Sequence, residues 1–180
     1  MCKQVSDQRS VCYGETSVTS AGVLRPSDMN VRDAMAAEAP VLEALQRRSS
    51  DVWEQYREAL AAHPDAIELP QTFIDNGWVR VAVDGTGAPI GFSVVIPGHD
   101  GAHELDGLFV EPARMQRGVG RLLIEDAAAR AARGGAERLE VTAGPAEGFY
   151  ERLGFHRVGA AQTRFGPAVR MRRELGAQTL

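Results

Sequence analysis

Three runs of β-forming residues, separated only by short polar loops, restrict the fold of this sequence more than any other feature. The runs are Trp78–Val83, Ile90–Ile96 and Glu104–Val110. Residues 84–89 join the first two and are rich in glycine, aspartate and proline, as in a hairpin connection. A glycine-rich loop, 97–101, precedes the third. Short connections join neighbouring antiparallel strands, so the middle of the chain predicts a three-stranded meander.

Helix and strand patterns alternate after the meander. Glycine ends both predicted helices, as expected where the chain leaves a helix in a left-handed conformation. A turn that contains Gly166-Pro167 is expected between the last two strands. The elements predicted here are, in order, a helix at 118–133, a strand at 138–142, a helix at 146–153, and strands at 155–160 and 168–175.

The N-terminal part predicts an extension, one strand and two helices. Residues 1–22 are rich in Ser, Thr and Gln and lack the apolar run of a signal peptide. We therefore expect a flexible extension, a single domain over 23–180 and a cytoplasmic location. A short strand is expected at 23–25. Apolar residues at helical spacing predict helices over 31–48 and 51–63, the second ended by Pro64.

Composition excludes several classes of protein. The chain has 180 residues, of which 44% are hydrophobic and 24% charged, enough apolar side chains to bury a core. No apolar run approaches the roughly 20 residues of a membrane-spanning helix. Cys2 and Cys12 lie in the polar N-terminal stretch without a second Cys/His cluster, so we expect no metal. The net charge of −4 argues against general nucleic-acid binding, although nearly all of the basic residues are arginine.

A glycine-containing stretch, Met115–Arg121, lies between the third strand of the meander and the helix after it. Gly118 and Gly120 allow the backbone to approach a ligand, and the helix start exposes unpaired N–H groups with partial positive charge. Such a site binds phosphate groups. A Rossmann fingerprint would need a third glycine where Leu123 stands, and a P-loop would need Gly-Lys-Ser/Thr, which is absent here.

Three segments in order along the chain together resemble the GCN5-related N-acetyltransferases, the GNAT superfamily. Glu104–Pro112 (ELDGLFVEP) is similar to the family's fourth strand, and 117–120 (RGVG) is similar to its pyrophosphate loop. Residues 146–155 (AEGFYERLGF) are similar to its Ala-x-x-x-Tyr-x-x-x-Gly-Phe helix. The resemblance extends from Leu24 to about Leu175. Two positions depart from the family pattern: Met115 stands where Gln or Arg is usual, and Ala143 where Asn is frequent.

The resemblance implies an α+β fold. Its central sheet is mixed and mostly antiparallel, has helices on both faces, and follows the order β-α-α-β-β-β-α-β-α-β-β. It also implies acetyl-CoA as co-substrate. The residues it assigns to acetyl-CoA are Leu108, Phe109 and Val110 for the pantetheine arm, and Gln116, Arg117, Gly118, Val119, Gly120 and Arg121 for the phosphates.

The resemblance further implies acetyl transfer to an amine by direct attack in a ternary complex. Glu104, fourteen residues before Gly118, is the first candidate for the general base, and Asp106 is the reserve. Gly107 suits a bulge that would free backbone groups on the strand, and an N–H near Leu108 or Phe109 would stabilise the oxyanion. Tyr150 stands where the family places a general acid.

Alternatives remain open for function and partners. The preferred hypothesis is an N-acetyltransferase acting on a small-molecule or peptide amine, with an acceptor pocket in the region of Trp53, Tyr56, Arg57 and Phe73. The first alternative is a catalytically inactive module that binds CoA as a sensor. A nucleic-acid-binding domain that uses the arginines is the weakest. Family analogy also suggests a homodimer, with an edge strand at 168–175 as one candidate surface.

Overall fold

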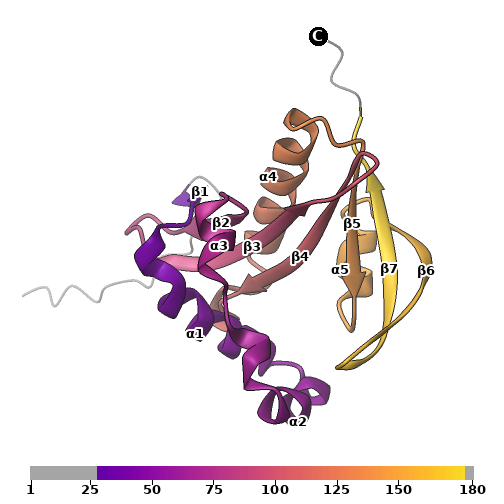
Figure 1. Ribbon diagram of the computed structural model, residues 1–180. Coiled ribbons are helices and arrows are strands. Elements are labelled where there is room, and N and C mark those ends of the chain that lie inside the picture. The colour runs from indigo at the N-terminus through magenta and orange to yellow at the C-terminus, as the bar shows by residue number, and fades with distance from the viewer. Residues whose placement is uncertain (1–27, 177–180) are drawn as a thin grey trace, which may run out of the picture.

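Seven strands form one continuous sheet in the computed structural model, which describes residues 28–176 (Figure 1). The order across the sheet is β1-β2-β3-β4-β5-β7-β6. Every neighbouring pair is antiparallel except β4 and β5, which run parallel. The expected mixed, mostly antiparallel sheet is therefore confirmed. The strands are β1 (Asn30–Asp33), β2 (Val79–Val83), β3 (Pro89–Pro97), β4 (Ala102–Val110), β5 (Arg138–Ala143), β6 (His156–Thr163) and β7 (Gly166–Glu174).

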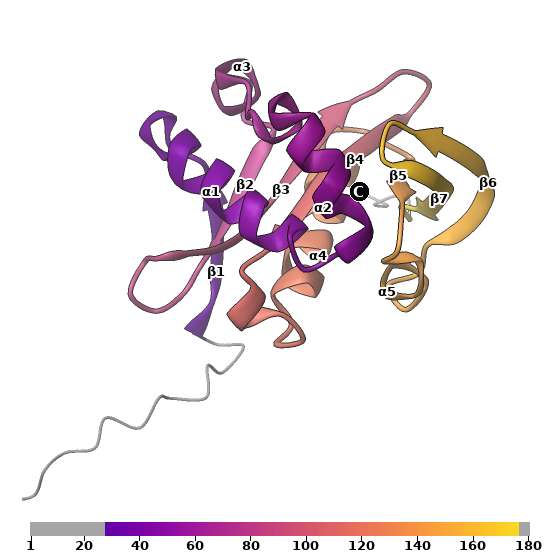
Figure 2. The same cartoon turned by 90° about the horizontal axis from the view of Figure 1, so that it is seen from below.

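Helices cover both faces of the sheet, as expected (Figure 2). Seen from below, α1, α2 and α3 lie on one side and α4 and α5 on the other. The apolar face of α1 packs through Leu42 and Leu45 on Phe92 of β3, while Ile124 of α4 packs on Leu139 of β5. No helix among residues 28–176 has the length and apolar character needed to cross a bilayer. The helices are α1 (Ala39–Ser50), α2 (Glu54–Ala62), α3 (Gln71–Asp75), α4 (Val119–Arg133) and α5 (Glu147–Glu151).

The beginning of the chain differs from the prediction. The helix predicted from residue 31 starts only at Ala39, with Pro40 in its first turn. Residues 30–33 form β1, and residues 36–38 form a short 3-10 helix. Val31 pairs with Ala82 of β2, and Asp33 accepts charge-assisted hydrogen bonds from Arg80 and Arg130. These long-range contacts override the helical spacing. The strand expected at 23–25 and the whole of the expected extension, 1–22, lie outside the described residues. The short helix α3 was not predicted.

The C-terminal hairpin also requires a correction. Its turn is formed by Arg164-Phe165, and Gly166-Pro167 begin β7 instead of forming the turn. Strand β7 lies between β5 and β6, so it is an interior strand of the sheet. The candidate dimer surface at 168–175 is therefore wrong, because its backbone groups already pair with two neighbouring strands.

Helix α4 lies unusually close to the sheet at Gly91 of β3. A Cβ atom at this position would lie 2.8 Å from the carbonyl oxygen of Phe109 and 3.0 Å from Cγ1 of Val119, the first residue of α4. Only glycine avoids both contacts. The close approach fixes the N-terminus of α4 beside the end of β4, where the predicted phosphate loop lies.

Ser93 gives a first testable prediction about stability. It is fully buried on β3, and its hydroxyl has no hydrogen-bond partner within residues 28–176. A buried hydroxyl without a partner costs about 1–3 kcal/mol. We expect Ser93→Ala to raise the free energy of unfolding by about 1 kcal/mol in urea denaturation. The matched control is Ser49→Ala, which removes the buried hydroxyl that accepts the Val110 N–H at 3.2 Å and should destabilise by a similar amount. Equal destabilisation by both would show that the Ser93 hydroxyl has a partner.

Candidate active site

The site lies where the two parallel strands of the sheet separate. Strands β4 and β5 pair from Ala102 and Arg138 as far as Leu105 and Val141, and beyond these residues no pairing joins them. Figure 1 shows β4 and β5 diverging beyond the point where they pair. A cavity of about 420 Å³ fills this region. Its walls come from β4, the end of β5, helices α1, α2 and α5, the segment 66–70 and the β6–β7 turn.

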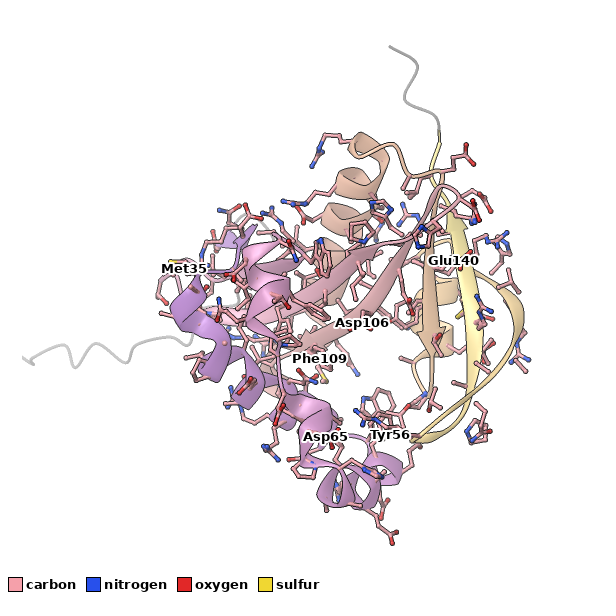
Figure 3. All side chains as sticks on the ribbon, viewed as in Figure 1. Met35, Tyr56, Asp65, Asp106, Phe109 and Glu140 are labelled. Atoms are coloured by element: carbon pink, nitrogen blue, oxygen red, sulfur yellow. The ribbon has the colours of Figure 1, made fainter. Side chains whose placement is uncertain are left out.

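A β-bulge in β4 marks the level at which the strands separate. Val94 of β3 pairs with Gly107, and the next residue, Val95, pairs with Leu105, so Asp106 is the extra residue of β4. The sequence predicted a bulge at Gly107, one residue away. Gly107 instead makes room for the ring of Phe109, because a Cβ atom at this position would lie 2.7 Å from that ring. The bulge turns Asp106 toward the cavity (Figure 3).

The backbone amides of β4 beyond the bulge point alternately to β3 and to the opening. Glu111 donates its N–H to Ile90 of β3, whereas Val110 donates to the Ser49 hydroxyl of α1 on the opposite side. By the two-residue repeat of a strand, the N–H of Leu108 faces the opening and that of Phe109 faces β3. Of the three residues assigned to the pantetheine arm, Leu108 therefore presents its amide to the opening, and Val110 has its amide already engaged.

The two carboxylates considered for the general base occupy different surroundings. Glu104 is exposed, pairs with Glu140 of β5 and lies outside the lining of the cavity. Arg138 and Arg172 donate hydrogen bonds to Glu140 at 3.0 and 2.9 Å and lower its pKa. Asp106 is exposed as well, but it lines the cavity, where partial desolvation by the surrounding protein raises its pKa. No cation within residues 28–176 pairs with it.

Tyr150, the predicted general acid, lines the same cavity as Asp106 and Leu108. It lies on α5 and is 8% exposed. The rings of Phe149 and Phe155 pack edge-on against it, with centroids 5.2 and 5.5 Å away. Burial, and to a smaller extent the nearby Tyr56 hydroxyl, raises the pKa of Tyr150 well above its usual range. The phenol therefore keeps its proton at physiological pH.

The predicted phosphate loop has the backbone of an anion site. Gln116 and Gly118 have φ angles of 60° and 87°, and Gly118 directly precedes α4. Within the described part of the chain, the amides from Gln116 to Arg121 donate no hydrogen bond. Unpaired amides at a helix start attract anions. A Cβ atom at Gly118 would meet nothing within 4 Å.

The second glycine of the loop has a structural use that the sequence did not indicate. A Cβ atom at Gly120 would lie 3.0 Å from the ring of Phe149, so this glycine lets α4 pack directly on α5. This contact joins the phosphate loop to the helix that carries Tyr150. The nearby Arg117 and Arg121 are exposed and form no ion pair with any residue of 28–176, whereas Arg114 lies 3.4 Å from Asp84.

Helix α2 and the β6–β7 turn close the cavity on the side of α1. The Tyr56 hydroxyl lies against Gly144, and the Tyr56 ring packs on Phe165 with centroids 5.9 Å apart. Arg164 forms a 3.0 Å ion pair with Asp65. Trp53, Tyr56 and Phe73 line the cavity, whereas Arg57 bonds the backbone of Asp51 and lies outside it. No local pattern of residues predicted the contacts made by Ser49, Gly144 or Phe165.

Comparison with known proteins agrees with this geometry. Residues 75–157 match the model of the acetyltransferase (GNAT) domain. The peptidyl-lysine N-acetyltransferase YjaB of Salmonella typhimurium is 28% identical over 134 residues, covering 74% of this chain and 88% of YjaB. Over residues 75–157, which include β2 to α5, this chain is therefore similar to the GNAT acetyltransferases. Both matches are to acetyltransferases.

Solved GNAT structures have the same fold. A GCN5-related N-acetyltransferase from Rhodopseudomonas palustris superimposes with a TM-score of 0.68 at 23% identity, covering 82% of this chain and 96% of its own. The PaiA N-acetyltransferase from Thermoplasma acidophilum, solved in complex with coenzyme A, gives 0.67 at 17% identity, covering 81% and 98%. The expected GNAT fold is therefore confirmed. Residues 28–176 contain no group of three or more His, Cys, Asp or Glu side chains arranged to hold a metal ion.

Proposed function

We propose that this protein transfers the acetyl group of acetyl-CoA directly to a primary amine, with both substrates bound together. The observation that carries the proposal is that one cavity, at the separation of β4 and β5, collects a carboxylate, an outward-facing amide and a protonated phenol. These are Asp106, the N–H of Leu108 and Tyr150. They correspond to the three demands of the reaction: removal of a proton from the amine, stabilisation of the oxyanion and protonation of the thiolate.

Asp106 is the general base in this proposal. An alkylammonium group has a pKa of about 10.4 and must lose a proton before its nitrogen can attack. A carboxylate whose pKa is raised by desolvation accepts that proton more readily than an ordinary one. The sequence ranks Glu104 as the first candidate for the base. Because Glu104 lies beside Glu140 and outside the cavity lining, the geometry supports Asp106 instead. Glu104 remains the competing candidate, acting through a chain of water molecules.

The backbone holds the thioester in this proposal. The Leu108 N–H donates to the thioester oxygen as it becomes negatively charged, and the remaining free backbone groups on this edge of β4 pair with the pantetheine arm. The amides of Gln116–Arg121 bind the pyrophosphate, and the unpaired Arg117 and Arg121 supply positive charge beside it. The departure at Met115 has little effect here, because backbone groups make the contacts.

Tyr150 protonates the departing thiolate in this proposal. Its raised pKa keeps the phenol neutral at physiological pH, so it holds a proton to donate. We expect Tyr150→Phe to lower kcat by about 10²-fold, within the usual range for loss of a general acid. The measurement is release of free CoA thiol from acetyl-CoA with a panel of primary amines. Since phenylalanine keeps the ring contacts, the thermal stability of the variant should change little.

The inactive-sensor alternative makes a different prediction for the same assay. A sensor would bind acetyl-CoA without amine-dependent release of CoA, and neither Asp106 nor Tyr150 would affect its binding. Amine-dependent turnover that fails in Tyr150→Phe supports the acetyltransferase. Turnover unchanged in Tyr150→Phe would remove this residue from the mechanism.

A further inference from the structure

Three charged side chains line the cavity, and only one of them has an ionic partner among residues 28–176. They are Glu68, Asp106 and Arg164. Arg164 is already neutralised, because it forms the 3.0 Å ion pair with Asp65 and lies over the ring of Phe165, 5.1 Å from its centroid. The carboxylates of Glu68 and Asp106 make no ion pair or hydrogen bond with any residue of 28–176. The two unpaired charges that face the cavity are therefore both negative.

Glu68 is exposed, and two hydrogen bonds from α1 anchor the segment of backbone that carries it. Its neighbours Ile67 and Leu69 are buried, at 3% and 7% exposure, so the chain alternates and presents Glu68 outward. Two side chains of α1 fix the segment: Gln46 donates to the carbonyl of Ala66 at 3.1 Å, and Glu43 accepts the N–H of Leu69 at 2.9 Å. A glutamate whose backbone is anchored in this way, and whose carboxylate has no partner, is suited to bind a cation.

The two carboxylates come from different walls of the cavity, Glu68 from segment 66–70 and Asp106 from β4. Asp106 is assigned by the proposed function to the reacting ammonium group. Aromatic rings of Trp53, Tyr56 and Phe165 line the cavity as well, and such rings favour both alkyl chains and cations. A cationic tail on the acceptor would pair with the Glu68 carboxylate, whereas a neutral tail would not.

Resting on the proposed function, we propose that the acceptor is a small aliphatic amine with a second cationic group, and that Glu68 is the residue that selects it. One amine reacts beside Asp106, and the second ammonium binds the Glu68 carboxylate. The cavity volume of about 420 Å³ is of the size that holds a small molecule. Glu68 acts on binding and takes no part in the chemical step, so its loss should raise KM and leave kcat nearly unchanged.

The test compares a graded series of α,ω-diaminoalkanes with n-alkylamines of the same chain lengths. We expect the wild type to prefer diamines, with one best length set by the separation of the two carboxylates. Glu68→Gln should lower kcat/KM for the best diamine about tenfold and leave kcat/KM for the monoamine nearly unchanged. The matched control is Glu58→Gln, which removes the same charge from an exposed position on α2 outside the cavity lining and should have no such effect.

Calorimetric titration of the diamine into the CoA-saturated protein separates this inference from the proposed function. Diamine binding that is lost in Glu68→Gln, in a protein that acetylates no amine, would support the inference and reject the proposed function. Acetylation of diamines and monoamines with equal kcat/KM would overturn the inference and retain the proposed function. Equal effects of Glu68→Gln and Glu58→Gln would also overturn it, since they would show only long-range electrostatics. Absence of both acetylation and diamine binding would overturn both proposals.

Discussion

Replacing Asp106 by asparagine should lower kcat/KM for acetyl transfer by about 10²- to 10³-fold at neutral pH, the range expected when a general base is lost. Asparagine keeps the size of the side chain but cannot accept the proton of the ammonium group. In the wild type, kcat/KM should increase with pH as Asp106 ionises, and the raised pKa moves this increase above the ordinary range of an aspartate. The variant should lack that increase. A pH profile of initial rates measures both effects.

Glu104→Gln is the matched control, because it makes the same chemical change two residues away on β4. Glu104 lies outside the cavity lining, so its loss should reduce kcat/KM by no more than about threefold, the size of a surface electrostatic effect. The reverse result, a large loss in Glu104→Gln and a small one in Asp106→Asn, would assign the base to Glu104 and a water chain.

The stability of Asp106→Asn shows whether any loss of activity comes from unfolding. A carboxyl with a raised pKa in the folded state binds its proton more tightly there than in the unfolded chain. Stability is then lost as pH rises through the raised pKa, because ionisation of the desolvated group is unfavourable. Asparagine removes this cost. The variant should therefore melt at the same or a higher temperature than the wild type at pH 7, and the difference should shrink in acid.

Most of the fold could be predicted because its signals are local. The meander from β2 to β4 and the helix α4 follow from alternation, helical spacing and glycine positions within a few residues. The start of α1 could not be predicted in this way. Its preceding residues Val31 and Asp33 join β1 through partners on β2 and α4, far away in the sequence. Spacing within a short window contains no information about such partners.

The site shows the same division between local and long-range information. Tyr150 and the phosphate loop were found because short motifs fix them. The choice between Glu104 and Asp106 depended on the bulge at Asp106 and on the separation of β5 from β4 after Val141. Neither feature can be predicted from the residues of β4 alone. Ser49 had no signal at all, since it reaches the N–H of Val110 only through the packing of α1 on the sheet.

Gly118→Glu should abolish the binding of acetyl-CoA. The substitution places a carboxylate at the start of α4, where it can occupy the unpaired amides of Gln116–Arg121 and repel the pyrophosphate. In a thermal-shift titration, ligand at 100 times its dissociation constant stabilises a protein by about 2.7 kcal/mol. We expect this stabilisation by acetyl-CoA, CoA and dephospho-CoA in the wild type, and its loss in Gly118→Glu, corresponding to at least a 100-fold weaker affinity.

The other end of α4 offers a closely matched control in Gly135→Glu. Both glycines have a φ angle of 87°, and a Cβ atom at either position meets nothing within 4 Å. A side chain should therefore cost about 1–2 kcal/mol of backbone strain in both cases, with a similar fall in melting temperature before ligand is added. Only Gly118 lies at the helix start, so Gly135→Glu should retain the full shift with acetyl-CoA. If Gly118→Glu also retained it, the phosphates would bind elsewhere, and the amides of this loop would have no part in holding the co-substrate.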